Sequence, residues 1–300
     1  MAAARRLVAA APAHGIDLSL IWAVVEPRNP DSIRQLCLAV PSPGRTAMLF
    51  VSEPQASGDS GGELGAARDR AACLSAACRY FEGERAARQS ARVVLAQGLP
   101  EPQDLWAIAA FEAAGFCTVG DLCYLRQTLK PVGRVASQPQ RALPTGVELV
   151  QVSSIQGRDA QDRELVEALD SSYVDTMDCP ELCGLRETRD VLESHRATGV
   201  WSAALWWIVV EHGRPRGCML LSRCPELRSA ELVYLGLAPS LRGRGVAGTL
   251  LRMGSELLAS ERDIEAVTCA VDLRNQPALR LYNRCGFRAI GERRAFVKPV

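Results

Sequence analysis

The residues with the clearest chemical potential form a glycine-rich turn that follows the apolar segment 231–239. The turn begins at Arg242 and contains Gly243, Gly245 and Gly248. Glycines permit a tight backbone that can approach an anion closely. Backbone N–H groups at the start of a helix point at such an anion, and the helix dipole favours its negative charge. The turn therefore predicts a pyrophosphate site, while an ordinary strand–helix connection remains the alternative.

The spacing of the turn separates it from other phosphate-binding motifs. Arg242, Gly245 and Ala247 give Arg-x-x-Gly-x-Ala, which is neither Gly-x-Gly-x-x-Gly nor a P-loop. It resembles the acetyl-CoA loop of the GNAT (GCN5-related N-acetyltransferase) superfamily, Arg/Gln-x-x-Gly-x-Gly/Ala. Residues 275–287 resemble the second signature of that superfamily, Asn-x-x-Ala-x-x-x-Tyr-x-x-x-Gly-Phe. The resemblance covers residues 147–300 well and the first half of the chain only in outline.

The resemblance implies a binding mode for acetyl-CoA. Backbone N–H groups of the turn would hold the pyrophosphate, and the strand before the turn would separate from strand 266–271 to admit the pantetheine arm. One N–H of the preceding strand would polarise the thioester carbonyl. Asn275 would contact the arm, although a helix N-cap before Pro277 explains it equally well. The implied cofactor set is Leu235, Gly236, Leu237, Arg242, Gly243, Arg244, Gly245, Val246, Ala247, Gly248, Thr249 and Asn275.

Two residues are candidates for proton transfer. Tyr282 occupies the tyrosine position of the second signature, and a phenol with a pKa near ~10 can protonate a departing thiolate. Glu231 lies in a strand pattern that resembles histone acetyltransferases and mycothiol synthases, where the glutamate is the base. A core tyrosine and a surface carboxylate at a strand end are the alternatives. Tyr234 lies three residues from Glu231, so the two side chains share a face only across a β-bulge.

The acceptor site is expected at an acidic connection between the first two helices of the second half. In the GNAT superfamily this connection forms one wall of the acceptor site. A solvated loop, with Pro180 and Gly184 as turn formers, explains the same sequence. The group that would receive a cationic amine is Tyr173, Asp175, Asp178 and Glu181.

The first half repeats the end of the second. Residues 107–121 align with residues 278–292 at a constant offset of 171. Phe111 stands at the position of Tyr282, and no Arg-x-x-Gly-x-Gly/Ala turn follows the strand expected at 47–52. We therefore expect an internal duplication whose first copy lacks the cofactor turn and the phenol.

Two further segments bear on the organisation of the chain. Residues 58–62 imitate the Gly-Asp-Ser-Gly-Gly of chymotrypsin-like proteases, but the only histidine before them is His14, in an Ala/Pro-rich stretch, so a flexible loop is expected over 54–62. Residues 131–146 are rich in proline, glycine and polar residues, as in a linker. We expect a degenerate GNAT-like domain over 1–130 and a catalytic domain over 147–300.

The expected fold class is α/β, or α+β layered. Each of the two GNAT-like domains would have a mixed, mostly antiparallel sheet with helices on both faces. Apolar periodicity predicts strands at 147–152, 201–211, 217–223, 230–237, 266–271 and 287–297. It predicts helices at 159–174, 185–197, 247–259 and 277–285. In the helix after the turn, the predicted buried residues are Leu250, Leu251, Leu257 and Leu258.

Composition excludes several classes of function. The net charge of +1 does not predict nucleic-acid binding, and no apolar run approaches the roughly 20 residues of a membrane span. The first 13 residues are too weakly apolar for a signal peptide. The 11 cysteines are odd in number and scattered, which indicates a reducing, cytoplasmic setting rather than disulfides. No metal is expected, because Cys179 and Cys183 lack a second ligand pair.

These observations together predict an N-acetyltransferase that transfers the acetyl group of acetyl-CoA to a primary amine of a small molecule or peptide. The tandem arrangement resembles mycothiol synthase in outline. A non-catalytic acyl-CoA-binding or sensor protein and a protein (N-terminal or lysine) acetyltransferase are the alternatives. The sequence names neither the acceptor nor the oligomeric state.

Overall fold

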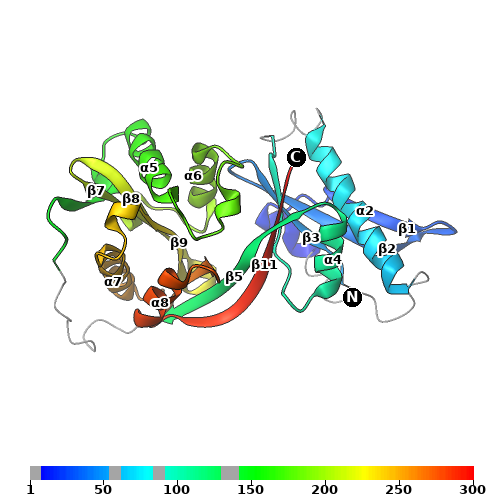
Figure 1. Ribbon diagram of the computed structural model, residues 1–300. Helices are drawn as coiled ribbons and strands as arrows, with labels where there is room; N and C mark the ends of the chain where they lie inside the picture. The colour runs from blue at the N-terminus through cyan, green and yellow to red at the C-terminus, as the bar shows by residue number, and fades with distance from the viewer. Residues whose placement is uncertain (1–7, 54–61, 84–91, 130–141) are drawn as a thin grey trace. The chain divides into compact units, whose positions relative to one another are not determined.

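The computed structural model describes residues 8–53, 62–83, 92–129 and 142–300, and Figure 1 shows the order of the elements. The chain divides into two compact units. Unit 1 comprises residues 1–119 and 293–300, and unit 2 comprises residues 120–292. Most of the predicted linker and of the protease-like segment lies outside the described residues. No helix in the described part of the chain has the length and apolar character needed to cross a membrane.

Unit 2 is a sheet covered by helices on both faces. Its strands lie in the order β5-β10-β9-β8-β7-β6, and all neighbours are antiparallel except β9 and β10. Figure 1 shows α5 and α6 on one face and α7 and α8 on the other. This confirms the predicted mixed, mostly antiparallel architecture. The elements are β5 (Cys117–Thr128), β6 (Val147–Gln151), α5 (Arg158–Tyr173), α6 (Thr188–Ala197), β7 (Trp206–Glu211), β8 (Arg214–Cys224), β9 (Ser229–Leu237), α7 (Val246–Ala259), β10 (Ala266–Asp272), α8 (Gln276–Arg284) and the first residues of β11 (Arg288–Pro299).

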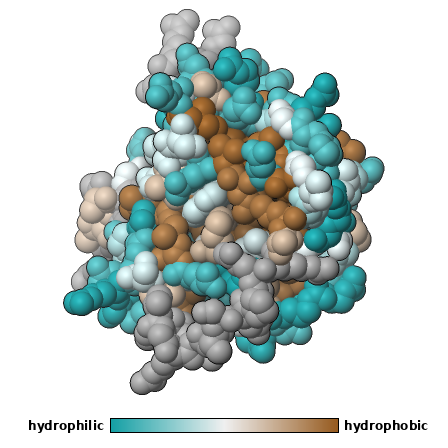
Figure 2. Space-filling model, turned by 90° about the vertical axis from the view of Figure 1, so that its left-hand side faces the viewer, coloured by the Kyte–Doolittle hydropathy of each residue, from teal (hydrophilic) through white to brown (hydrophobic). Residues whose placement is uncertain are grey.

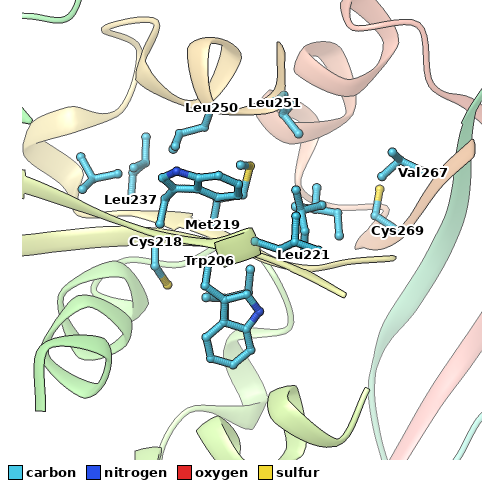
Figure 3. Close-up of a cluster of buried hydrophobic side chains, with 14 of the residues drawn as sticks. Trp206, Cys218, Met219, Leu221, Leu237, Leu250, Leu251, Val267 and Cys269 are labelled. Carbon is cyan, nitrogen blue, oxygen red and sulfur yellow. The ribbon is translucent and has the colours of Figure 1, made fainter. Parts of the chain in front are cut away.

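The strands of unit 2 pack apolar side chains on both faces. Figure 3 shows Trp206 and Cys218 on one face of the sheet and Met219, Leu237 and Leu250 on the other. All five side chains are buried. Such two-sided burial explains the nearly continuous apolar sequence of β7 and β8. Figure 2 views the molecule from the side where β7 lies in Figure 1 and shows apolar surface bordered by hydrophilic side chains.

Unit 1 has a smaller sheet of the same kind. Its strands lie in the order β1-β2-β3-β4-β11, and only the β3–β4 pair is parallel. A separate apolar core, which includes Leu74, Phe81 and Phe111, holds its helices on the sheet. The elements are a 3₁₀ turn (Ala11–His14), β1 (Ile21–Glu26), β2 (Asn29–Ser42), β3 (Thr46–Val51), α2 (Gly62–Glu82), β4 (Leu95–Gly98), α4 (Leu105–Ala113) and the end of β11.

The predicted duplication is visible in matching backbone contacts. Phe116 N donates to Phe111 O at 3.0 Å, and Phe287 N donates to Tyr282 O at 3.0 Å. The glycine that ends each of these helices, Gly115 or Gly286, has a left-handed backbone with φ of 77° or 89°. Both repeats therefore terminate this helix by the same device.

The last strand of each repeat completes the sheet that is built mainly from the other repeat. In unit 1, Leu95 of β4 lies opposite Pro299 of β11. In unit 2, Ala266 of β10 lies opposite Thr128 of β5. The offset of 171 residues that relates the repeats converts one pair into the other. The compact units therefore do not coincide with the sequence segments 1–130 and 147–300.

Some sequence-based boundaries were wrong. The predicted strand 201–211 begins only at Trp206, because Ala203–Leu205 forms a 3₁₀ turn. The helix predicted from Leu185 begins at Thr188. Leu257, predicted to be buried, is 39% exposed, because the apolar stripe of α7 is narrower than the leucine pattern indicates.

Candidate functional site

The glycine-rich turn leads directly into α7, as predicted. Gly243 and Gly245 have left-handed φ values of 75° and 89°, which L-residues with side chains rarely adopt, and Gly245 is the N-cap of the helix. Thr249 N donates to Gly245 O at 3.2 Å, the first bond of the helical pattern. The N–H groups of the preceding helical residues have no carbonyl four positions back within the helix. The start of α7 therefore offers backbone donors to an anion.

The two arginines of the turn are held by protein groups. The Arg242 guanidinium donates to the carbonyl oxygens of Leu237, Ser172, Val174 and Asp175 at 2.6–3.1 Å. It thereby fastens the end of β9 to the end of α5. The backbone N–H of Arg242 also has a partner, because it donates to Pro239 O at 3.2 Å, so each donor nitrogen of this predicted cofactor residue is engaged by a protein group.

Arg244 forms an ion pair with Glu211, with an N–O distance of 2.7 Å. Hydrogen bonds from Ser240 and then from Arg244 lower the pKa of Glu211. The arginine side chain is thus turned toward the end of β7.

Strands β9 and β10 part where the cofactor arm is expected. Their parallel pairing joins residues 229–231 to residues 266–268 and ends at Glu231 and Thr268. Directly after β9, Ala238 N donates to the carbonyl of Arg216 in β8 at 2.7 Å. Because successive N–H groups of a strand alternate in direction, those of Leu237 and Leu235 point away from β8. Two of the three predicted β9 residues therefore direct donors into the opening.

A β-bulge brings Glu231 and Tyr234 to one face. Glu231 lies opposite Ser222 and Tyr234 lies opposite Leu220, so three residues of β9 span two of β8. Ser222 and Leu220 share a face because they are two residues apart. The hydroxyl oxygens of Tyr234 and Ser172 of α5 lie 2.7 Å apart, so this is the α5 face. The sequence predicted that Glu231 and Tyr234 could share a face only across a β-bulge, and the structure has that bulge.

Glu231 is partly buried at the point where β9 and β10 part. Burial raises the pKa of its carboxyl. Its neighbours across the sheet, Ser222 and Thr268, are both hydroxyl residues. Ser222 is 0% exposed, and its hydroxyl has no partner among the residues described. Sequence reasoning missed this polar row, because only strand register brings residues 222, 231 and 268 together.

Tyr282 lies on α8 with its ring 5.4 Å from that of Phe287. It is 6% exposed. Burial, and next the thiol of Cys269 on β10, raise the pKa of Tyr282 well above its usual range. The phenol therefore keeps its proton at neutral pH.

Comparison with known proteins now bears on this arrangement. The model of the acetyltransferase (GNAT) family matches residues 171–287. Residues 171–287 form a GNAT domain. A mycothiol acetyltransferase of Clavibacter michiganensis is 35% identical over 86 residues, which cover 29% of this chain and 23% of that protein. The match therefore spans less than a quarter of that relative.

Two solved structures resemble the fold over most of the chain. A GCN5-related N-acetyltransferase from Sphaerobacter thermophilus is 19% identical, with a TM-score of 0.58 over 95% of this chain and 82% of that one. A tandem GNAT protein from the clavulanic acid biosynthesis pathway is 15% identical, with a TM-score of 0.50 over 93% and 82%. At these identities the likeness shows the tandem GNAT fold alone.

In the GNAT domain, Asn275 is the N-cap of α8. Its Oδ1 accepts a hydrogen bond from Ala278 N at 3.2 Å. Because the cap uses the side-chain oxygen, the side-chain amide nitrogen can still donate to a ligand, so both predicted roles of Asn275 are compatible. The N-cap interpretation is therefore confirmed, and the cofactor contact stays a prediction.

Two of the predicted acceptor residues, Asp178 and Glu181, are engaged by the end of β10. Asp178 Oδ1 accepts from Asp272 N at 2.8 Å, and Asp272 Oδ2 accepts from Cys179 N at 3.1 Å. Glu181 forms an ion pair with Arg274 at 2.6 Å. The connection between α5 and α6 is thus fastened beside α8.

The other two predicted acceptor residues differ in exposure. Asp175 is exposed and has a left-handed φ of 50°. The Tyr173 ring is half-buried, with its centroid 5.8 Å from that of Tyr234. The His195 ring stacks on that of Tyr234 with a centroid distance of 5.5 Å, and burial lowers its pKa to about 4, so it is neutral at neutral pH. Sequence reasoning missed His195 because it is an isolated histidine.

No group of three or more His, Cys, Asp and Glu side chains that could hold a metal ion is found within the described ranges.

Proposed function

We propose that the chain is an N-acetyltransferase that transfers the acetyl group of acetyl-CoA to a primary amine of a small molecule or peptide. The observation that carries the proposal is the separation of β9 from β10 directly after Glu231. The opening begins at a partly buried carboxylate and leads toward the start of α7. A base and an anion site at the two ends of one opening suit a nucleophile and a CoA thioester.

The cofactor would be held mainly by backbone groups. Its pyrophosphate would accept from the N–H groups of residues 245–248 at the start of α7, since those of Arg244 and Thr249 already donate to Leu241 O and Gly245 O. Its pantetheine arm would lie along Leu235 and Leu237, whose N–H groups point into the opening. One of these N–H groups would stabilise the oxyanion of the tetrahedral intermediate. Asn275 would contact the arm through its amide nitrogen.

The chemistry follows from two proton carriers. Glu231 takes one proton from the acceptor ammonium, and the freed nitrogen forms a bond to the acetyl carbonyl carbon. When the intermediate collapses, the carbon–sulfur bond breaks and Tyr282 gives its proton to the CoA thiolate. The second nitrogen proton restores Tyr282 through solvent. Glu231 gives the first proton to solvent, so one proton is released in each turnover. Binding both substrates in one opening supplies much of the rate through proximity.

The acceptor would lie against the connection that follows α5. Of the predicted group, Asp178 and Glu181 are bonded to residues at the end of β10, whereas Tyr173 and Asp175 are not. Asp178 and Glu181 would act mainly by holding the connection in place. An amine that carries one positive charge suits this surface.

The test is CoA release from acetyl-CoA with a panel of amines, aminoglycosides and peptides. Turnover with at least one class, and its loss in Glu231→Gln, support the proposal. Binding of acetyl-CoA without turnover on any acceptor would favour a sensor protein. Turnover restricted to peptides would identify a protein acetyltransferase.

A further inference from the structure

Gln127 connects the two helices that carry the proposed site. It lies on β5, the strand that the first repeat supplies to unit 2. Its Nε2 donates to Cys285 O at the end of α8 at 2.6 Å. Its Oε1 accepts from the hydroxyl of Ser255 on α7 at 2.8 Å. One half-buried amide thus joins α7 to α8.

The bridge adds a second point of attachment between these helices. Near the start of α7, a Cβ built on Gly248 would lie 3.6 Å from Leu281 Cδ1 of α8, so the helices are in contact there. Ser255 lies seven residues later, about 10 Å along the helix. Two attachments that far apart fix the angle between α7 and α8. Tyr282 and the pyrophosphate turn are therefore fixed relative to each other.

The first repeat's unit has only half of this bridge. Lys298, 171 residues after Gln127, donates through Nζ to Ala114 O at 2.8 Å. Ala114 and Cys285 are related by the same offset. A lysine has donors and no acceptor, so it cannot receive a bond from a helix equivalent to α7. The hydrogen bond that Gln127 accepts from the second helix therefore has no counterpart at Lys298.

We propose that Gln127 is a positioning residue that holds α7 against α8 and so sets Tyr282 relative to the bound pyrophosphate. This inference rests on the proposed function. It gives the first repeat a part in the reaction, because its last strand supplies the side chain that orders the site of the second. Gln127 itself touches neither substrate.

The two hydrogen bonds can be removed separately in the full-length protein. Gln127→Lys keeps the donor toward Cys285 and loses the acceptor for Ser255, Ser255→Ala removes the same bond from the other side, and Gln127→Leu removes both. Lys298→Leu is the matched control, since it removes the equivalent bond in unit 1. The readouts are the Kd of acetyl-CoA by calorimetry, kcat, the KM of each substrate, and the melting temperature.

We expect Gln127→Lys and Ser255→Ala each to weaken acetyl-CoA binding about fivefold, and Gln127→Leu about twentyfold, as hydrogen bonds of ordinary strength imply. The combination of Gln127→Lys with Ser255→Ala should lose no more than either alone. Gln127→Leu should also lower kcat, because it displaces Tyr282. In a Tyr282→Phe background, which lacks the phenol, Gln127→Leu should leave kcat unchanged. Lys298→Leu should lower the melting temperature and leave Kd and kcat unchanged.

Unchanged Kd and kcat in Gln127→Leu, with a loss of melting temperature similar to that of Lys298→Leu, would overturn the inference. A wild-type protein that does not bind acetyl-CoA would instead overturn the proposed function, and the inference with it. The wild-type titration separates these two failures.

Discussion

At the position that Glu231 occupies in unit 2, unit 1 has Met48. Each lies at the last pair of a parallel ladder, Met48 opposite Gln97 and Glu231 opposite Thr268. The partners on the other side are Val40 and Ser222. The row that is polar in unit 2 thus has two apolar members in unit 1, while the strand pairing is the same.

The phenol position differs in the same way. In unit 1 a Cβ on Gly98 would lie 2.2 Å from the Phe111 ring, so this glycine lets the ring approach β4 closely. Phe111 also stacks on Phe296 at 5.4 Å. In unit 2 the equivalent positions are Cys269 and Tyr282. The two units therefore share the same strand pairing and helix termination. They differ in a few side chains, which are apolar in unit 1 and carry groups capable of proton transfer in unit 2.

The largest expected effect is the loss of the base. Glu231→Gln should lower kcat/KM at neutral pH by about 10²–10⁴-fold, because the amide cannot accept the amine proton. Met48→Gln, at the equivalent position of unit 1, should leave turnover unchanged. Steady-state assay of CoA release measures both. Full turnover in Glu231→Gln would place the base elsewhere.

Tyr282→Phe gives unit 2 the residue that unit 1 already has. We expect kcat to fall about 10²-fold with little change in the Kd of acetyl-CoA, since only proton donation to the thiolate is lost. Phe111→Tyr should lower the melting temperature without creating activity, because it buries a hydroxyl in a filled core. An unchanged kcat in Tyr282→Phe would mean that another group protonates the thiolate.

A smaller effect is expected from the backbone of the turn. Gly245→Ala forces a side chain into a left-handed N-cap, which costs about 1–2 kcal/mol, and should weaken acetyl-CoA binding about tenfold. Gly157 is the N-cap of α5 with a similar φ of 85°, and it is the matched control. Gly157→Ala should lose comparable stability in thermal unfolding and keep the wild-type Kd. Equal Kd values for the two variants would remove the turn from the cofactor site.

The smallest effect is a displaced pH profile. Because burial raises the pKa of Glu231, the carboxyl becomes protonated at a higher pH than an ordinary glutamate when the solution is acidified. As the solution is acidified from neutrality, kcat/KM should therefore begin to fall before the pH reaches ~4.5, the ordinary pKa of a glutamate. The raised pKa of Tyr282 should leave the alkaline side free of a tyrosine limb up to about pH 10. A flat acid limb in kcat/KM down to pH 4.5 would contradict the assignment of Glu231.

Sequence predicted the local features and missed those that depend on register. The turn at Gly243–Gly248 and the cap at Asn275 can be predicted from residues adjacent in sequence. The constant offset between the repeats can be read by aligning two short segments. The exchange of the last strands, by which β5 pairs with β10 and β11 pairs with β4, cannot be predicted from the sequence. The two strands are copies of one another, so either could pair at either position. The bulge in β9 and the polar row beside Glu231 arise only when strands pair. The engagement of Glu181 by Arg274 likewise needs the fold, since the acidic connection alone gives no partner.

The central claim is that the fold is present twice and the cofactor site once. Isothermal titration of the full-length protein with acetyl-CoA tests it most directly. The account predicts one bound molecule per chain in the wild type, and none in Gly245→Glu, whose carboxylate would repel the pyrophosphate. Two molecules per chain, or one remaining in Gly245→Glu, would contradict it.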